Sequence, residues 1–213
     1  MGKIKNRVVS VILLMLITIT MISISGCGKN KNNLFESKLS ESEAIEKVST
    51  LVVDSYDINV VVYGAGLPTL DLEEEEESLY RTVIENDKFN STIDIRKEIE
   101  RLYSKRFASI MINTALVGTP GEYGQTIIYA RYIDGKYGLS MIKDNSVIKG
   151  DDENEDDASG GIDVLKYDPS TIRIHKISAR FIEAYITSES GETTILVTLI
   201  LEDGEWKIDC PTY

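Results

Sequence analysis

The pattern of apolar and polar residues divides the chain into three parts. Val8 to Ile24 is an almost unbroken apolar stretch. From Ser40 to Ala115 apolar residues recur every three or four positions, which predicts helices, and from Thr126 onward they alternate with polar residues, which predicts strands. Helices followed by strands favour an α+β fold, with N-terminal helices packed on a curved antiparallel sheet.

The first helix is expected to begin at Ser40, because Ser40-Glu41-Ser42-Glu43 has the S-x-x-E pattern of a capping box. Its apolar face carries Ala44, Ile45, Val48, Leu51, Val52 and Ser55. The apolar segment 58–63 either continues the helix or starts a strand, and Gly64, Gly66 and Pro68 end it in both cases.

Two further helices are expected before residue 118. Thr92 or Asp94 begins the second, and Ser104 is the expected N-cap of the third. A short strand over 79–84 precedes them.

The strand-rich half contains three turn signals. Asp134-Gly135 lies between the β-forming runs 127–133 and 137–142, which predicts a hairpin. Four more strands are expected over 172–177, 179–188, 193–202 and 205–208, with turns at Ser190-Gly191 and Asp203-Gly204.

The N-terminal stretch is typical of a secretory signal peptide, because it follows a basic, acid-free stub. Ile24-Ser25-Gly26-Cys27 directly after it resembles the lipobox of a bacterial lipoprotein. This resemblance implies cleavage before Cys27, diacylation of its thiol and anchoring on the extracytoplasmic face of the cell membrane. The alternatives are an uncleaved signal anchor and ordinary cleavage after Ser25.

Three segments follow from this interpretation. Residues 1–26 are the signal peptide, 27–39 are a polar, lipidated tether, and 40–213 form a single domain with acidic loops at 71–77 and 150–161. Removing the signal peptide takes away three of the 23 Lys and Arg residues and none of the 35 Asp and Glu residues, which leaves a net charge of −15. Nucleic acid is therefore excluded as a partner.

Few residues offer catalytic or metal-binding chemistry. Cys210 has no disulfide partner if Cys27 is lipidated, and we interpret it as a packed thiol. His175 is the only histidine, so no His-based zinc site can form, and the common hydrolase, nucleotide-binding and redox motifs are absent from the sequence. No cofactor or metal is expected.

The second acidic loop partly matches the ligand spacing of an EF-hand calcium site. Asp152, Asn154, Asp156 and Asp163 fall at ligand positions 1, 3, 5 and 12, but Asp157 occupies the position that needs glycine, and a strand is expected where a helix should follow. We interpret the loop as solvated rather than as a specific calcium site.

Tyrosine is abundant, with 11 residues against four phenylalanines. Its ring and hydroxyl suit both polar cavities and protein interfaces. The candidate cavity or interface residues are therefore His175, Tyr129, Tyr132 and Tyr185, which lie on expected strands or at their edges. The alternative for the tyrosines is ordinary core and rim packing, and for His175 it is a structural or solvent-facing position.

The ending 201–213, in which Asp203-Gly204 precedes Trp206 on a last strand, resembles the final hairpin of NTF2-like (cystatin-like cone) domains. The resemblance implies a cone-shaped fold over residues 40–213. A fainter likeness, carried by Tyr80, Asp94-Ile95 and Ser104 to Phe107, is to the DL-endopeptidase inhibitor family of Gram-positive cell walls.

These features lead to three functional hypotheses. The first is a non-enzymatic, lipid-anchored, extracytoplasmic binding protein that acts on the cell wall or on wall enzymes. The second is a cavity enzyme of NTF2-like type, which requires His175 to be buried in a pocket beside a carboxylate. The third is an accessory subunit of a membrane complex.

Overall fold

The computed structural model describes residues 39–75, 78–118, 129–143 and 162–213, apart from the side chain of Glu74. The chain divides into two compact units, 1–38 and 39–213, and all described residues belong to the second. The predicted signal peptide, Cys27 and the whole second acidic loop, 150–161, lie outside the described residues.

Helix α2 (Glu41–Val62) is the longest helix of the described residues. The amide of Glu43 donates to Ser40 Oγ at 3.3 Å, and the amide of Ser40 donates to Glu43 Oε2 at 2.8 Å, so the predicted capping box is confirmed. The segment 58–62 continues the helix rather than starting a strand. Its side chains at 58, 61 and 62 are buried, which explains why this part of the helix is apolar on several sides.

Helices α3 (Thr92–Leu102) and α4 (Lys105–Ile112) follow, and a π-helical turn, η2 (Asn113–Val117), extends α4. Ser91 caps α3 by accepting from the amide of Asp94 at 3.2 Å. Ser104 caps α4 by accepting from the amide of Phe107 at 3.2 Å, as the sequence predicts. Between these helices only Tyr103 and Ser104 are available to turn the chain.

A small antiparallel sheet has the strand order β1-β3-β2, formed by β1 (Tyr80–Thr82), β2 (Tyr132–Gly135) and β3 (Gly138–Ile142). The hairpin prediction is confirmed, but its turn is Lys136-Tyr137, and Gly135 pairs with Gly138 inside the ladder. A short 3-10 turn, η1 (Glu73–Glu75), precedes β1, and Glu75 accepts hydrogen bonds from the Thr82 amide and hydroxyl, each at 2.8 Å.

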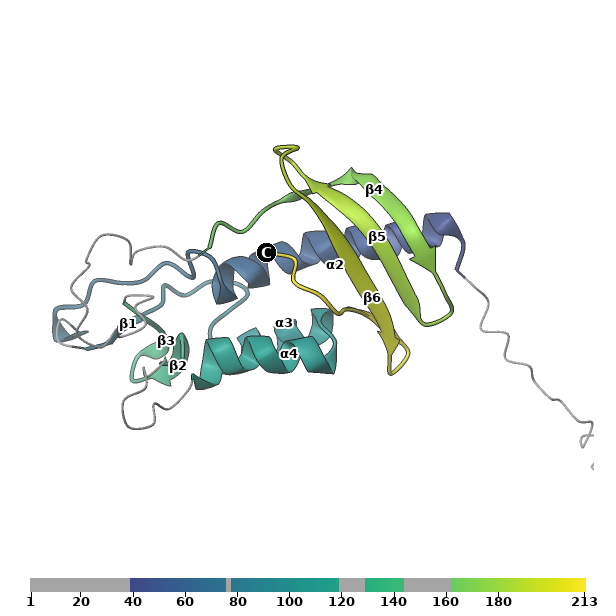
Figure 1. The fold of residues 1–213 in the computed structure, drawn as a ribbon. Coiled ribbons are helices and arrows are strands. Elements are labelled where there is room, and N and C mark those ends of the chain that lie inside the picture. The colour runs from purple at the N-terminus through teal and green to yellow at the C-terminus, as the bar shows by residue number, and fades with distance from the viewer. Residues whose placement is uncertain (1–38, 76–77, 119–128, 144–161) are drawn as a thin grey trace, which may run out of the picture. The chain divides into compact units, whose positions relative to one another are not determined.

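The second sheet is an antiparallel meander of β4 (Tyr167–Ile177), β5 (Phe181–Ser188), β6 (Thr194–Glu202) and β7 (Glu205–Ile208). Asp203 and Gly204 form the β6–β7 turn with φ of 52° and 87°, as a type I′ turn requires. Figure 1 shows α2 passing behind this sheet, where it contacts β4 and β7.

The α+β prediction is confirmed, but the expectation of a single sheet is wrong, because the strands form two. β1 pairs with β3, with Tyr80 opposite Ile142. The sheet of the β2–β3 hairpin is therefore completed by β1, which comes earlier in the chain, rather than by β4. The NTF2-like cone stays a prediction.

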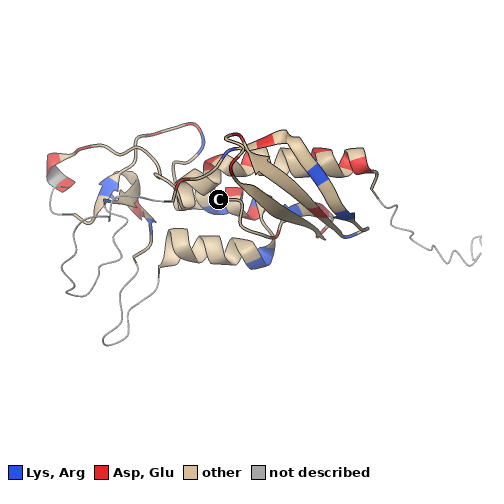
Figure 2. Ribbon diagram, turned by 45° about the horizontal axis from the view of Figure 1, so that its top comes forward, with Lys and Arg blue, Asp and Glu red and all other residues tan. Residues whose placement is uncertain are grey.

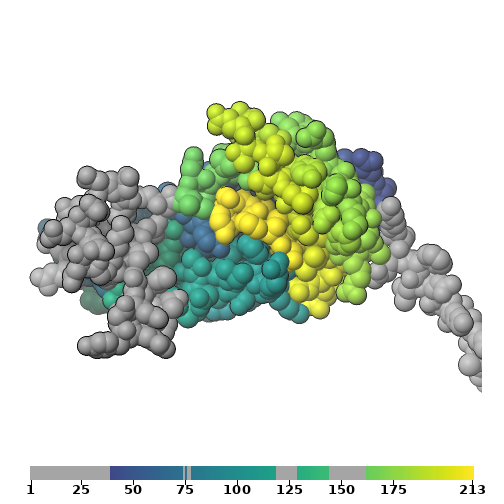
Figure 3. Space-filling view, in the orientation of Figure 1, coloured from purple at the N-terminus to yellow at the C-terminus, as the bar shows by residue number. Residues whose placement is uncertain are grey.

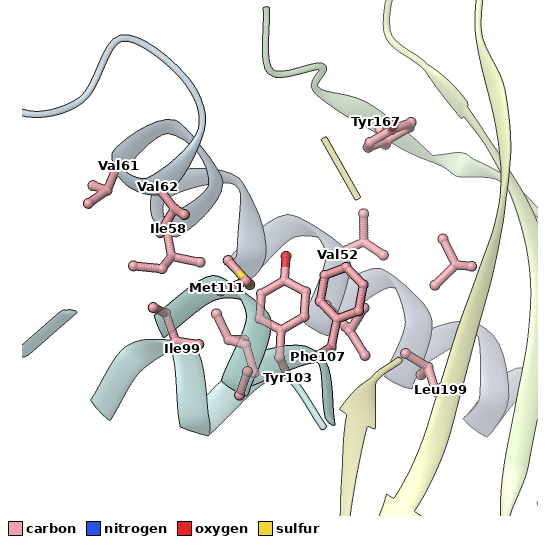
Figure 4. Close-up of a cluster of buried hydrophobic side chains, with 14 of the residues drawn as sticks. Val52, Ile58, Val61, Val62, Ile99, Tyr103, Phe107, Met111, Tyr167 and Leu199 are labelled. Atoms are coloured by element: carbon pink, nitrogen blue, oxygen red, sulfur yellow. The ribbon is translucent and has the colours of Figure 1, made fainter. Parts of the chain in front are cut away.

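One continuous core joins α2, α3 and α4 to the four-stranded sheet. In Figure 4 the ring of Tyr103 lies beside Phe107, and their centroids are 5.5 Å apart. The same buried cluster contains fully buried apolar side chains from the helices and the sheet, among them Val48, Ile58, Ile95, Ile99, Leu102, Met111, Ile182, Ile186, Leu199 and Ile208.

Residues 209–213 leave β7 and pack against α2. Figure 3 shows this yellow segment between the teal helices and the green strands. Tyr213 stacks on Tyr63 with ring centroids 3.9 Å apart. Thr212, 2% exposed, hydrogen-bonds with the fully buried Asn59 and with Tyr103. These residues therefore complete the core that α2 begins.

Candidate binding surface

The face of the four-stranded sheet that points away from α2, here called the outer face, carries a cross-strand row of larger side chains. The register places Arg173 on β4 opposite Tyr185 on β5, and Tyr185 opposite Leu196 on β6. A second row consists of Lys176, Glu183 and Thr198. In the view of Figures 1 and 3, no other described segment covers this face.

Exposure alternates along these strands. Tyr185 and Leu196 are 38% and 41% exposed, whereas their neighbours Ala184, Ile186 and Val197 on the inner face are completely buried. Alternation is expected for an antiparallel sheet with one solvated face. The outer face therefore presents Tyr185 and Leu196 to solvent.

His175 occupies a β-bulge between the paired residues Ile174 and Lys176. It is exposed, and its ring meets the ring of Tyr185 edge to face, with centroids 5.6 Å apart. Within the described residues no carboxylate hydrogen-bonds to it. This geometry fits the interface prediction for His175 and Tyr185, and it does not fit the buried pocket that the enzyme hypothesis requires.

The prediction that Tyr132 faces a cavity or interface is wrong. Tyr132 is completely buried, and its hydroxyl donates to the carbonyl oxygen of Val61 at 3.0 Å and accepts from the Leu67 amide at 3.2 Å. It thus caps the end of α2 from the small sheet. Tyr129 lies before β2, is partly exposed, and lines none of the pockets described next.

Three pockets lie away from the outer face, with volumes of about 500, 680 and 420 Å³. The first follows the exposed side of α2, the second lies between α3, α4 and the β6–β7 turn, and the third lies beside η1. Each pocket contains ion pairs: Lys88–Asp57 and Arg101–Asp54 in the first, Lys105–Asp203 and Lys207–Glu205 in the second, and Arg81–Asp71 in the third.

The best-developed of these ionic groups surrounds Glu98. Its carboxylate accepts from Arg101 Nε at 2.8 Å and Nη2 at 3.0 Å, and it lies 3.0 Å from Lys88 Nζ. The hydrogen bonds from Arg101 are the main reason that the pKa of Glu98 is lowered. The group joins α3 to α2 through Asp54 and Asp57, so we interpret it as structural.

Three cations on β4 and in the β4–β5 turn have no such acidic partner among the described residues. Arg173, Lys176 and Arg180 are exposed, and none forms an ion pair or a side-chain hydrogen bond with another described residue. Lys176 Nζ instead lies 4.7 Å from the ring centroid of Phe181. Figure 2, in which Lys and Arg are blue, shows blue positions toward one end of the four-stranded sheet.

Metal binding gains no support from the part of the chain that the structure describes. No group of three His, Cys, Asp or Glu side chains there is arranged to hold a metal ion. Asp163, the last residue of the EF-hand comparison, is exposed, and Asp152, Asn154 and Asp156 lie outside the described residues.

Cys210 packs against the core, as the sequence suggests for a structural thiol. Its Sγ accepts from the Thr198 amide at 3.2 Å, and burial raises the pKa of the thiol from 9.0 to about 11. The thiolate is the form that reacts, so its fraction near neutral pH falls about 100-fold.

We therefore expect Cys210 to be alkylated by iodoacetamide about 100-fold more slowly in the folded chain than in 8 M urea at the same pH. Peptide mapping by mass spectrometry follows Cys210 specifically. Equal rates in the two states would contradict the buried thiol.

None of the helices within the described residues is long and apolar enough to cross a membrane. The chain matches no known protein-family model, and no curated protein sequence matches it.

Proposed function

We propose that this chain is a lipid-anchored, extracytoplasmic binding protein whose working surface is the outer face of the four-stranded sheet. The observation that carries the proposal is the uncovered row Arg173–Tyr185–Leu196, with the exposed His175 against Tyr185. Aromatic and arginine side chains supply much of the binding energy at protein surfaces.

The length of the proposed tether fits the anchor. Residues 28–39 can extend about 40 Å at roughly 3.5 Å per residue. The domain can thus stand clear of the membrane and reach a component of the cell wall, either a wall polymer or a wall enzyme.

The anchor is tested by replacing Cys27 with serine in cells that are fed alkyne-tagged palmitate. We expect the wild-type chain to carry the label and to sediment with membranes. The C27S variant should lose the label and be released or retained as an unprocessed precursor, because two acyl chains provide stable anchoring.

The chain supplies a matched control in Cys210, its only other cysteine. The C210S variant should label and sediment like the wild type. Palmitate on C27S, or a wild-type chain without label, would overturn the lipid anchor.

The working surface is tested separately with a photo-crosslinking amino acid at position 185 or 196, both exposed on the outer face. Position 53, which is 53% exposed on α2, is the control. Crosslinks to one recurrent cell-envelope component from 185 and 196, and not from 53, are expected. Equal crosslinking from all three positions would contradict the assignment of the surface.

A further inference from the structure

We infer that the outer face binds an anionic glycopolymer, a chain of sugar or polyol units that bear phosphate or carboxylate groups. This inference rests on the proposed function and identifies the chemistry of its partner. Three properties of the described surface support it: unpaired cations, their spacing, and the aromatic and hydroxyl groups beside them.

The charge of this region is opposite to that of the chain. The full sequence has a net charge of −12. Arg173 and Lys176 are exposed on the outer face, Arg180 is exposed in the β4–β5 turn, and the acidic residue opposite Lys176 is the partly buried Glu183. No described carboxylate pairs with these cations, and such cations attract an anionic ligand.

The cations follow the strand rather than forming a single cluster. Arg173 and Lys176 pair with Tyr185 and Glu183, which are two residues apart on β5, so their rows are separated by about 7 Å. Arg180 adds a third exposed cation in the turn that follows β4. A line of charges suits a ligand with repeated anionic groups better than a single compact anion.

Groups that suit sugars lie next to this line. The exposed ring of Tyr185 offers an apolar face and a hydroxyl, and Leu196 extends the apolar area. Thr187 and Thr194 meet at 2.9 Å between their hydroxyl oxygens, one row further along the same face. A sugar or polyol could place C–H groups on the ring and hydroxyls on the threonines.

An anionic lipid surface fits these observations less well. A membrane presents a broad anionic plane to the domain, whose proposed mature chain carries a net charge of −15, whereas a single polymer chain meets only the residues that lie along the line of cations. On the outer face Tyr185 lies between Glu183 and Thr187, and Leu196 lies between Thr194 and Thr198. Both residues lie within strands and do not project from a loop.

The test measures binding of residues 39–213, which form one compact unit and lack the proposed anchor, to four probes by isothermal titration calorimetry. The probes are poly(glycerol phosphate), polygalacturonate, neutral dextran, and vesicles that contain phosphatidylglycerol. We expect binding to one or both anionic polymers, weakened by salt, and no binding to dextran or to the vesicles. The two anionic polymers distinguish phosphate from carboxylate as the recognised group.

Two variants locate the site. R173Q/K176Q/R180Q should weaken binding at least about tenfold, because it removes three charged contacts. Y185A should weaken it about fivefold if the ring stacks on the polymer. The controls are K47Q/R96Q/K97Q, which removes the same charge from exposed positions on α2 and α3, and Y137A, which truncates an exposed tyrosine of the small sheet.

Each other outcome overturns the inference. Equal loss in R173Q/K176Q/R180Q and K47Q/R96Q/K97Q would show nonspecific attraction, and binding only to vesicles would indicate a lipid partner. No binding to either polymer, together with a protein crosslinked from position 185, would replace the polymer with a protein partner. That result would overturn the polymer inference but leave the proposed function intact. Failure of palmitate labelling would overturn the lipid anchor but would not affect polymer binding.

Discussion

Replacing Asn59 with leucine is expected to lower the free energy of unfolding by about 2–4 kcal/mol. Asn59 is completely buried on α2, and its amide nitrogen donates to Thr212 Oγ1 at 2.9 Å and to the Thr212 carbonyl at 3.1 Å. Its amide oxygen accepts from the Tyr103 hydroxyl at 2.7 Å. Leucine has a similar volume but leaves these partners without a hydrogen bond in the core.

The effect is measured by urea denaturation, followed through the fluorescence of Trp206, the only tryptophan. The triple variant N59L/Y103F/T212V is the informative control, because it replaces most of the buried polar groups together. It should be more stable than the sum of its single variants predicts, since partners removed together are not left unpaired. Additive losses would contradict a connected network.

Replacing Gly66 with alanine is expected to destabilise the fold by about 2–4 kcal/mol. Gly66 has φ of 81°, which disfavours a side chain. An added Cβ would also lie 2.4 Å from Met141 Sδ, 2.8 Å from Arg131 Nη2 and 3.0 Å from the Tyr132 hydroxyl. Arg131 is buried and donates to the Val62 carbonyl at 2.9 Å, so it cannot move without breaking the cap of α2.

A comparison with Gly191 separates the cost of the positive φ from the cost of crowding around an added Cβ. Its φ is 78°, close to that of Gly66, but an added Cβ would meet no atom within 4 Å. G191A should therefore lose only about 1 kcal/mol, the cost of the backbone conformation. The same urea titration compares both variants. If G66A and G191A lose equal stability, crowding against Arg131 and Met141 is not significant.

Local signals in the sequence predict the helices well. Ser40 and Ser104 cap the helices that they are expected to cap, because a capping interaction spans only three residues and can be read from the sequence directly. The Asp203-Gly204 turn is also correct, since its type needs positive φ at both positions.

Features that depend on tertiary contacts could not be predicted from the sequence. Tyr132 and Tyr185 both lie on alternating strands, yet one is completely buried and the other exposed, because alternation does not reveal which face meets the core. Arg131 had no local signal at all: its role depends on carbonyl groups about 70 residues earlier. The pairing of His175 with Tyr185 likewise required the bulge in β4.

The contact between α2 and residues 209–213 has a consequence for the timing of folding. Ser55 and Thr212 are 157 positions apart in the sequence. During synthesis α2 emerges early, but the partner that satisfies its buried polar groups is added only after both sheets have been made. The core around α2 can therefore be completed only after residues 209–213 have been translated. Contacts between residues so far apart in the sequence also favour slow folding. A chain that crosses a membrane before folding would benefit from that delay.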